Sequence, residues 1–258
     1  MYDALHYALG GLSGGLVGLT LGLVGGGGSI LAVPLMVYVV GVSDPHVAIG
    51  TSALAVAVNA ATSLSHHARA HTVKWRCGAI YAGAGVVGAL LGSTIGKAID
   101  GHRLLSLFAL LMLVVGALML KNRKAEGIPG AQCSRENAAQ VVGFGLGTGT
   151  FSGFFGIGGG FLIVPGLMAS THMPMINAVG TSLVAVTAFG LTTALNYAAS
   201  GLVAWGIALV FIAGGIAGGL VGTSAARRLS GAGTLTTVFA CLIFVVAAYM
   251  LAKSWNAG

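Results

Sequence analysis

Charged side chains are scarce in this sequence. Only 7% of its 258 residues are Asp, Glu, Lys or Arg, and only 5 of these are acidic, whereas a soluble domain has about 25% charged residues. Residues 104–120 contain no charged side chain, and about 20 apolar residues are enough to cross a bilayer as a helix. The composition therefore excludes a soluble enzyme, a nucleic-acid-binding domain and a disordered tail, and it predicts an all-α polytopic membrane protein.

Cysteine is also rare, and the sequence does not indicate a metal site. Cys77, Cys133 and Cys241 are far apart and lack the spacing of metal ligands. His67 and His71 have an i, i+4 spacing that could hold a metal. No carboxylate or cysteine accompanies them, and the neighbouring Arg and Lys side chains would repel a cation. We expect no metal site and no cofactor.

The acidic residues all lie outside the apolar segments or at their ends; they are Asp3, Asp44, Asp100, Glu126 and Glu136. Carboxylates within membrane spans usually mark ion paths or proton relays, so their positions here argue against a carboxylate-based cation pump. The apolar segments also lack a catalytic carboxylate pair, a Cys/His dyad and a paired-histidine haem site. An intramembrane enzyme or cofactor-binding subunit is therefore the weakest of the functional classes, and we expect a protein that is not an enzyme.

What the sequence does contain is a long series of apolar segments. They run over residues 4–24, 29–41, 46–65, 77–97, 104–120, 137–155, 160–171, 176–199, 203–226 and 233–252. The longest polar stretch, 121–140, divides the chain nearly in half. We therefore predict a first membrane repeat over 1–121, a cytoplasmic linker over 122–136 and a second membrane repeat over 137–258.

The two halves resemble each other in sequence. Gly50-Thr51-Ser52 recurs as Gly180-Thr181-Ser182, and Trp75 recurs as Trp205. A glycine run followed by a proline precedes the first triplet, and a second such run precedes the other. Scattered glycines match one another easily in apolar sequence, but this ordered series indicates an internal duplication.

The distribution of basic residues favours inverted repeats. If each half makes five passes, the repeats are inverted, and the basic stretches 66–76, 121–136 and 227–228 share one side, with Lys97, Arg103 and Lys253 on the other. Four passes per half would make the repeats parallel and would separate the charges less well. Because basic residues concentrate in cytoplasmic loops, we predict inverted repeats of about five helical segments each, with both termini outside.

The glycine runs and the triplets carry a family resemblance. The runs are GGGGSILAVP over 25–34 and GIGGGFLIVP over 156–165, and they are followed by AIGTS over 48–52 and AVGTS over 178–182. This pattern resembles the TauE/SafE sulfite exporter family, and the resemblance covers nearly the whole chain. It implies a bacterial membrane transporter of sulfite, sulfonates and related sulfur anions, and it does not identify the anion.

Each glycine run predicts a broken helix. A helix that begins at Ser29 or Gly160 would leave its first N–H groups unpaired and its positive dipole end exposed, which favours an anion. Interrupted segments at matching positions of two halves point to the binding site of a transporter. The candidate contacts are Gly27, Gly28, Ser29, Gly158, Gly159 and Gly160. The alternative is that these glycines only let helices pack closely.

A polar stripe follows each Gly-Thr-Ser triplet. At about 100° per residue, Thr51, Ser52, Asn59 and His66 share one helical face. The second repeat carries Thr181, Ser182 and Asn196 on the equivalent face. Hydroxyl and amide groups can bind an anion without a fixed charge, so we predict substrate contacts here. The alternative is that these groups hold helices together or bond their own backbone carbonyls.

These observations favour a secondary transporter, expected to be an exporter, of small sulfur-containing anions in the bacterial inner membrane. A channel-like anion pathway could use the same groups, and a transporter of another small anion is a further alternative. The expected partners are the anion and the lipid bilayer, without nucleic acid. Oligomerisation is possible.

Overall fold

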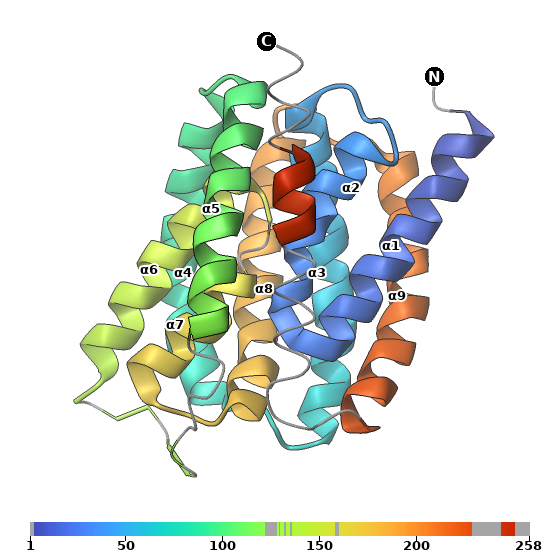
Figure 1. The fold of residues 1–258 in the computed structure, drawn as a ribbon. Coiled ribbons are helices and arrows are strands. Elements are labelled where there is room, and N and C mark those ends of the chain that lie inside the picture. The colour runs from blue at the N-terminus through green and yellow to red at the C-terminus, as the bar shows by residue number, and fades with distance from the viewer. Residues whose placement is uncertain are drawn as a thin grey trace.

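The computed structural model describes residues 3–121, 128, 130, 131, 133, 134, 136–157, 160–228 and 244–250 (Figure 1). Its regular structure is helical throughout these residues. The elements are α1 (Ala4–Val24), the 3-10 helix η1 (Gly25–Leu31), α2 (Ala32–Tyr38), α3 (Pro45–Arg69), α4 (Trp75–Lys97), α5 (Gly101–Lys121), α6 (Ala138–Phe155), α7 (Gly160–Thr171), α8 (Met175–Ala198) and α9 (Trp205–Arg228). Residues 244–250 are also helical. The protein is an all-α polytopic membrane protein.

Six helices in the described part of the chain are long and apolar enough to cross a membrane, namely α1, α3, α4, α5, α8 and α9. Large apolar side chains on the outside of these helices are exposed, including Leu90, Leu110 and Leu209. Trp75 and Trp205, at the first residues of α4 and α9, are also exposed. Tryptophan is enriched at membrane–water interfaces, so these two residues fit the two faces of a bilayer.

The repeats are inverted, because equivalent helices run in opposite directions. A Cβ on Gly50, near the start of α3, would lie 2.8 Å from Cβ of Tyr197 near the end of α8. A Cβ on Gly180, near the start of α8, would lie 2.6 Å from Oγ1 of Thr72 just after α3. We call the end where α3 finishes and α4, α6 and α8 begin the linker end. The other, where α1, α3 and α9 begin, is the far end (Figure 1).

The two repeats are interleaved. The first helix of each repeat packs along the fourth helix of the other, so that α1 pairs with α9 and α6 pairs with α4. Together with α3, the helices α1 and α9 form one three-helix group, which we call unit A. The helices α4, α6 and α8 form the equivalent unit B, and the α3–α8 contact joins the two units.

Glycine makes the helix pairs possible. In unit B, a Cβ on Gly149 of α6 would collide with the backbone of Gly85 on α4, and a Cβ on Gly153 would collide with Ala89. In unit A, Gly18 of α1 meets the backbone of Gly215 on α9 in the same way. Small residues at such contacts let membrane helices approach closely. Packing therefore explains most of the glycine outside the two runs.

The two glycine runs differ in structure. In the second repeat, α6 ends with Gly156 in the left-handed conformation at φ 66°, and α7 begins at Gly160 as predicted. In the first repeat, the expected helix start at Ser29 is wrong. Residues Gly25–Leu31 form η1, and the α-helix begins only at Ala32. The i→i+3 bonds of a 3-10 helix use N–H groups that the prediction left unpaired.

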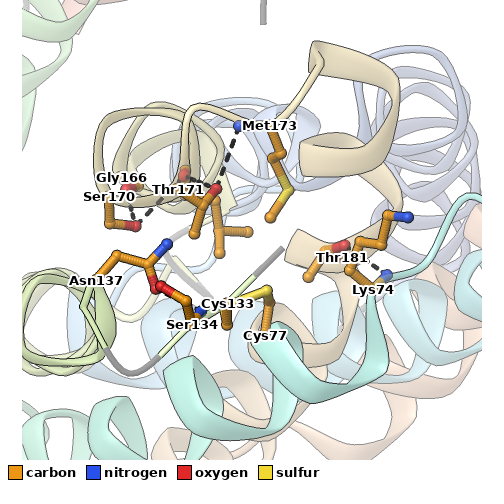
Figure 2. The surroundings of a disulfide bond; sticks show 11 residues. Lys74, Cys77, Cys133, Ser134, Asn137, Gly166, Ser170, Thr171, Met173 and Thr181 are labelled. Carbon is orange, nitrogen blue, oxygen red and sulfur yellow. Dashed lines mark hydrogen bonds between the residues drawn. A yellow bond between two sulfur atoms is a disulfide. The ribbon is translucent and has the colours of Figure 1, made fainter. Parts of the chain in front are cut away.

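A disulfide lies at the linker end, where the sequence predicted no role for cysteine. It joins Cys77, in the first turn of α4, to Cys133, which precedes α6 (Figure 2). Both residues are buried. The same segment is bound to the α7–α8 turn, because the Ile128 N–H donates to the His172 carbonyl at 2.7 Å. The bond therefore holds the end of the linker against unit B.

Candidate functional site

The threonines of the two Gly-Thr-Ser triplets connect the repeats. The Thr51 hydroxyl on α3 accepts a hydrogen bond from the backbone N–H of Ala204, just before α9, at 2.9 Å. The Thr181 hydroxyl on α8 accepts one from the backbone N–H of Lys74, just before α4, at 2.9 Å (Figure 2). Each hydroxyl thus pairs an N–H group at the start of a helix in the other repeat.

We call the Thr51–Ala204 bond and the Thr181–Lys74 bond the two clamps. The glycine and serine of each triplet have structural contacts beside them. A Cβ on Gly50 would collide with the Leu202 carbonyl, so glycine is needed for the approach of the turn before α9. The hydroxyls of Ser52 and Ser182 donate to carbonyls of their own helices, Ile49 and Val179, at 3.0 and 2.8 Å. The triplets therefore have a structural role in the described structure. Their proposed contact with substrate stays a prediction.

Thr51 and Thr181 do not share one site. Because α3 and α8 are antiparallel and Gly190 of α8 lies beside Ala53 and Ala57 of α3, the two threonines are separated by roughly 20 Å along the helices. One clamp, at Thr51, therefore lies near the far end, and the other, at Thr181, lies near the linker end.

Asn59 lies between these clamps, in the middle of α3. Its side chain is 1% exposed, and neither amide atom has a hydrogen-bond partner. It is packed against Gly215 of α9, where a Cβ would collide with the amide nitrogen. A buried polar group without a partner costs about 1–3 kcal/mol. Asn59 is therefore the predicted site residue whose donors and acceptor are still available to a ligand.

The equivalent position in unit B has no polar group. Phe189 takes the place of Asn59, and its ring contacts Gly85 as Asn59 contacts Gly215. Beside it, the Tyr81 and Thr148 hydroxyls form a hydrogen bond of 2.8 Å. Beside Phe189, therefore, the Tyr81 and Thr148 hydroxyls are paired with each other, whereas the equivalent place in unit A carries an unpaired amide.

Both polar side-chain atoms of Asn196, at the far end of α8, are hydrogen-bonded. Its Oδ1 accepts from the Lys97 ammonium at 2.9 Å, and its Nδ2 donates to the Ser93 and Thr94 hydroxyls at 2.6 and 3.2 Å. Its equivalent His66 is half-buried near the linker end of α3. Asn196 and His66 therefore lie at opposite ends of the molecule, far from each other and from Asn59.

The glycine runs also lie on opposite sides of the level of Asn59. Gly28 is packed against Thr20 and Leu21 of α1, toward the linker end, and Gly156 is packed against Ile49, toward the far end. The helix η1, which contains Gly28, and the helix α7, which follows the second run, are in contact with each other.

Of the remaining candidates in the runs, Gly27 lies in η1, and Ser29 and Gly160 are buried. Gly158 and Gly159 lie outside the described residues.

Several polar residues were missed by the sequence reasoning. The hydroxyls of Ser152 and Tyr197 are buried without a partner, and Lys97 binds across α4 and α8. Lys97 stands at the end of an apolar segment and aligns with Arg227, a position typical of a lysine that extends toward the membrane surface. Its alignment with Arg227 was visible in the sequence, but its partners are remote in the chain.

Comparison with known proteins now defines the family. The profile of the sulfite exporter TauE/SafE family matches residues 10–250. This chain belongs to the TauE/SafE family.

A relative from Xylella fastidiosa (strain Temecula1 / ATCC 700964), named a probable membrane transporter protein, is 54% identical over 94% of each chain. The probable membrane transporter protein YunE of Bacillus subtilis (strain 168) is 29% identical over 85% of this chain and 87% of its own. No solved structure matches. The TauE/SafE assignment makes this protein a membrane transporter, and its inverted, interleaved repeats are of the kind on which transporters build their substrate sites.

Proposed function

We propose that this TauE/SafE protein is a secondary transporter that exports small sulfur-containing anions, such as sulfite or organosulfonates, across the bacterial inner membrane. The family description supports a sulfur anion as substrate, and the bacterial relatives support the location. The structural observation that carries the proposal is the unpaired amide of Asn59 at the contact between the repeats.

The chemistry of Asn59 suits an anion that must also be released. Its Nδ2 group offers two donors and no charge. An oxyanion would gain charge-assisted hydrogen bonds there, which are stronger than bonds between neutral groups. A fixed positive charge at this depth would hold the anion more tightly and would cost more to bury. The scarcity of charge in the spans is consistent with binding by neutral donors.

The position of Asn59 supports a carrier. It lies where α3 of the first repeat meets α9 of the second, between the clamps near the two ends of the molecule. The path that we propose runs along this α3–α9 contact. Movement at one clamp opens the amide to one side while the other clamp stays closed, which is alternating access between inverted repeats.

Transport by purified protein in liposomes tests the function. We expect saturable sulfite uptake and counterflow, in which internal unlabelled sulfite accelerates the entry of labelled sulfite. Unsaturable flux without counterflow would instead indicate a channel. Transport of carboxylates alone would contradict the sulfur-anion assignment.

Asn59→Leu tests the site. Leucine has the branched shape of asparagine and leaves no unpaired polar group, but it is larger, so we expect a moderate fall in melting temperature from the tighter contact with Gly215. Loss of hydrogen bonds to a charged ligand costs about 1.5–3 kcal/mol, so the KM for sulfite should rise by at least about tenfold. The control is Phe189→Leu, at the equivalent position of unit B, which should lower the melting temperature and leave KM unchanged. An unchanged KM in Asn59→Leu would contradict the assignment of this residue.

A further inference from the structure

Lys97 joins the ends of two helices at the far end of the molecule. From the last residue of α4, its ammonium donates to the backbone carbonyl and Oδ1 of Asn196 and to the Ser200 hydroxyl, at 3.1, 2.9 and 2.9 Å. It also lies 5.9 Å from the centre of the Tyr197 ring. Lys97 therefore connects the end of α4 to the end of α8.

All these partners are neutral, so the charge of Lys97 is not balanced by a carboxylate among the described residues. Two acidic side chains at this end bind backbone N–H groups. Asp44 accepts from the backbone N–H of His46 at 2.8 Å, and Asp100 accepts from that of Arg103 at 3.1 Å. An ammonium and an anionic oxygen attract each other as opposite charges, in addition to their hydrogen bond, and a neutral oxygen lacks this attraction. An oxyanion that reached Lys97 would therefore compete well with its present partners.

Two further groups in this cluster lack partners. Tyr197 is fully buried, and its hydroxyl has no hydrogen bond. The ring of His46, from the first turn of α3, lies 6.3 Å from the Tyr197 ring, and its Nδ1 atom is buried without a partner. Lys97, Tyr197 and His46 come from α4, α8 and α3, and the Tyr197 ring lies near both the ammonium and the His46 ring.

A purely structural role would not require these features. A lysine that only caps the end of α8 gains from the carbonyls and from the helix dipole, but that role leaves the Tyr197 hydroxyl and His46 Nδ1 unexplained. The same surroundings are what an oxyanion needs, because the ammonium supplies charge and the hydroxyl supplies a donor.

We propose that Lys97, with Tyr197 and His46, forms an oxyanion-binding site at the far end of the molecule. We call it the mouth site, and it is separate from Asn59. An oxyanion bound here replaces Asn196 and Ser200 as the partner of the ammonium, and it thereby loosens the connection between α4 and α8. The identity of the oxyanion as a sulfur species rests on the proposed function. The ligand class of this mouth site, a small oxyanion, follows from the cluster itself.

Asn196→Asp is the sharpest test, because it changes the charge of the partner and almost nothing of its shape. The new carboxylate would pair with Lys97 and occupy the site. We expect the melting temperature to stay or rise, while the KM for sulfite rises by about tenfold. Lys97→Gln should raise KM similarly by removing the charge. If Lys97→Gln proves unfolded, Asn196→Asp alone still decides, because it keeps the link between the helices.

The matched control is His102→Asp. His102 is exposed on the first turn of α5 at the same end, so this variant adds negative charge without contacting the cluster, and its KM should stay close to that of the wild type. Equal KM values for Asn196→Asp and wild type, or an equal rise in His102→Asp, would overturn the mouth site. Wild-type protein that transports no sulfur oxyanion would instead contradict the proposed function. The mouth site is then measured directly, with sulfate and sulfite as probes: each should raise the melting temperature of wild type more than that of Asn196→Asp, in which Asn59 is still free to bind the probe.

Discussion

At mid-depth in unit A, Asn59 of the first repeat is packed against Gly215, and both of its amide atoms lack partners. At the same place in unit B, Phe189 of the second repeat is packed against Gly85. Near the two ends, by contrast, the repeats match closely, since Thr51 and Thr181 make the same bond to the start of a partner helix at the same distance. Duplication has kept the clamps alike and has allowed the middle to diverge. We infer that the clamps support the fold and that the difference at mid-depth serves binding.

The close helix contacts shared by both units should give the largest effect. Gly149→Leu on α6 would force a side chain into the backbone of Gly85, and the protein should fail to fold or to reach the membrane. Gly147 lies two residues earlier on the same helix, and a Cβ there would meet nothing within 4 Å, so Gly147→Leu should be tolerated. Expression and size-exclusion profiles in detergent distinguish them. Equal behaviour of the two variants would contradict the packing role of Gly149.

The clamps should give an intermediate effect that is alike in both repeats. Thr51→Val and Thr181→Val keep the shape of the side chain and remove the acceptor for an N–H group at a helix start, which costs about 1–2 kcal/mol. We expect the two variants to lower the melting temperature by similar amounts.

Thr187→Val is the control for the clamps, because the Thr187 hydroxyl only donates to the Leu183 carbonyl of its own helix. It should change the melting temperature little. If Thr51→Val and Thr181→Val kept full stability but lost transport, the original interpretation as substrate contacts would be favoured over the clamp.

The turns between α3 and α4 and between α8 and α9 should give the smallest effect. His71 in the first repeat and Gly201 in the second hold equivalent positions, with φ of 54° and 71°. Glycine adopts this left-handed conformation without a steric cost. His71→Gly should therefore be neutral or stabilising by less than about 1 kcal/mol, and Gly201→His should be mildly destabilising. Chemical denaturation of the two variants measures this difference, and a large loss of stability in His71→Gly would show that the histidine side chain has a role in the turn.

Much of the architecture was predictable from local sequence. The series of apolar segments predicted the helices, since the bilayer requires about 20 apolar residues per span. The repeated Gly-Thr-Ser and tryptophan positions predicted the duplication, and the basic loops predicted the inversion. Among the described residues, the predicted start of α2 was wrong, because the first glycine run forms a 3-10 helix where the second breaks. Of the last predicted segment, 233–252, the structure describes only 244–250. The choice between these backbones depends on what packs against each run.

The roles of the polar stripe could not be predicted in the same way. Helical periodicity placed Thr51, Asn59 and Asn196 on equivalent faces, but it did not show which hydroxyl or amide would find a partner. Thr51 meets Ala204, and Asn196 meets Lys97, across sequence separations of 153 and 99 residues. The Cys77–Cys133 bond likewise joins residues that no spacing rule relates.

By itself, therefore, the sequence determined that this is an inverted-repeat membrane protein, because hydropathy and positive charge act locally and every segment must satisfy them. The tertiary structure alone decided which polar groups are satisfied, because a hydrogen bond across helices depends on partners that only packing brings together. It paired the threonines and Asn196, and it left Asn59 buried without a partner beside Gly215.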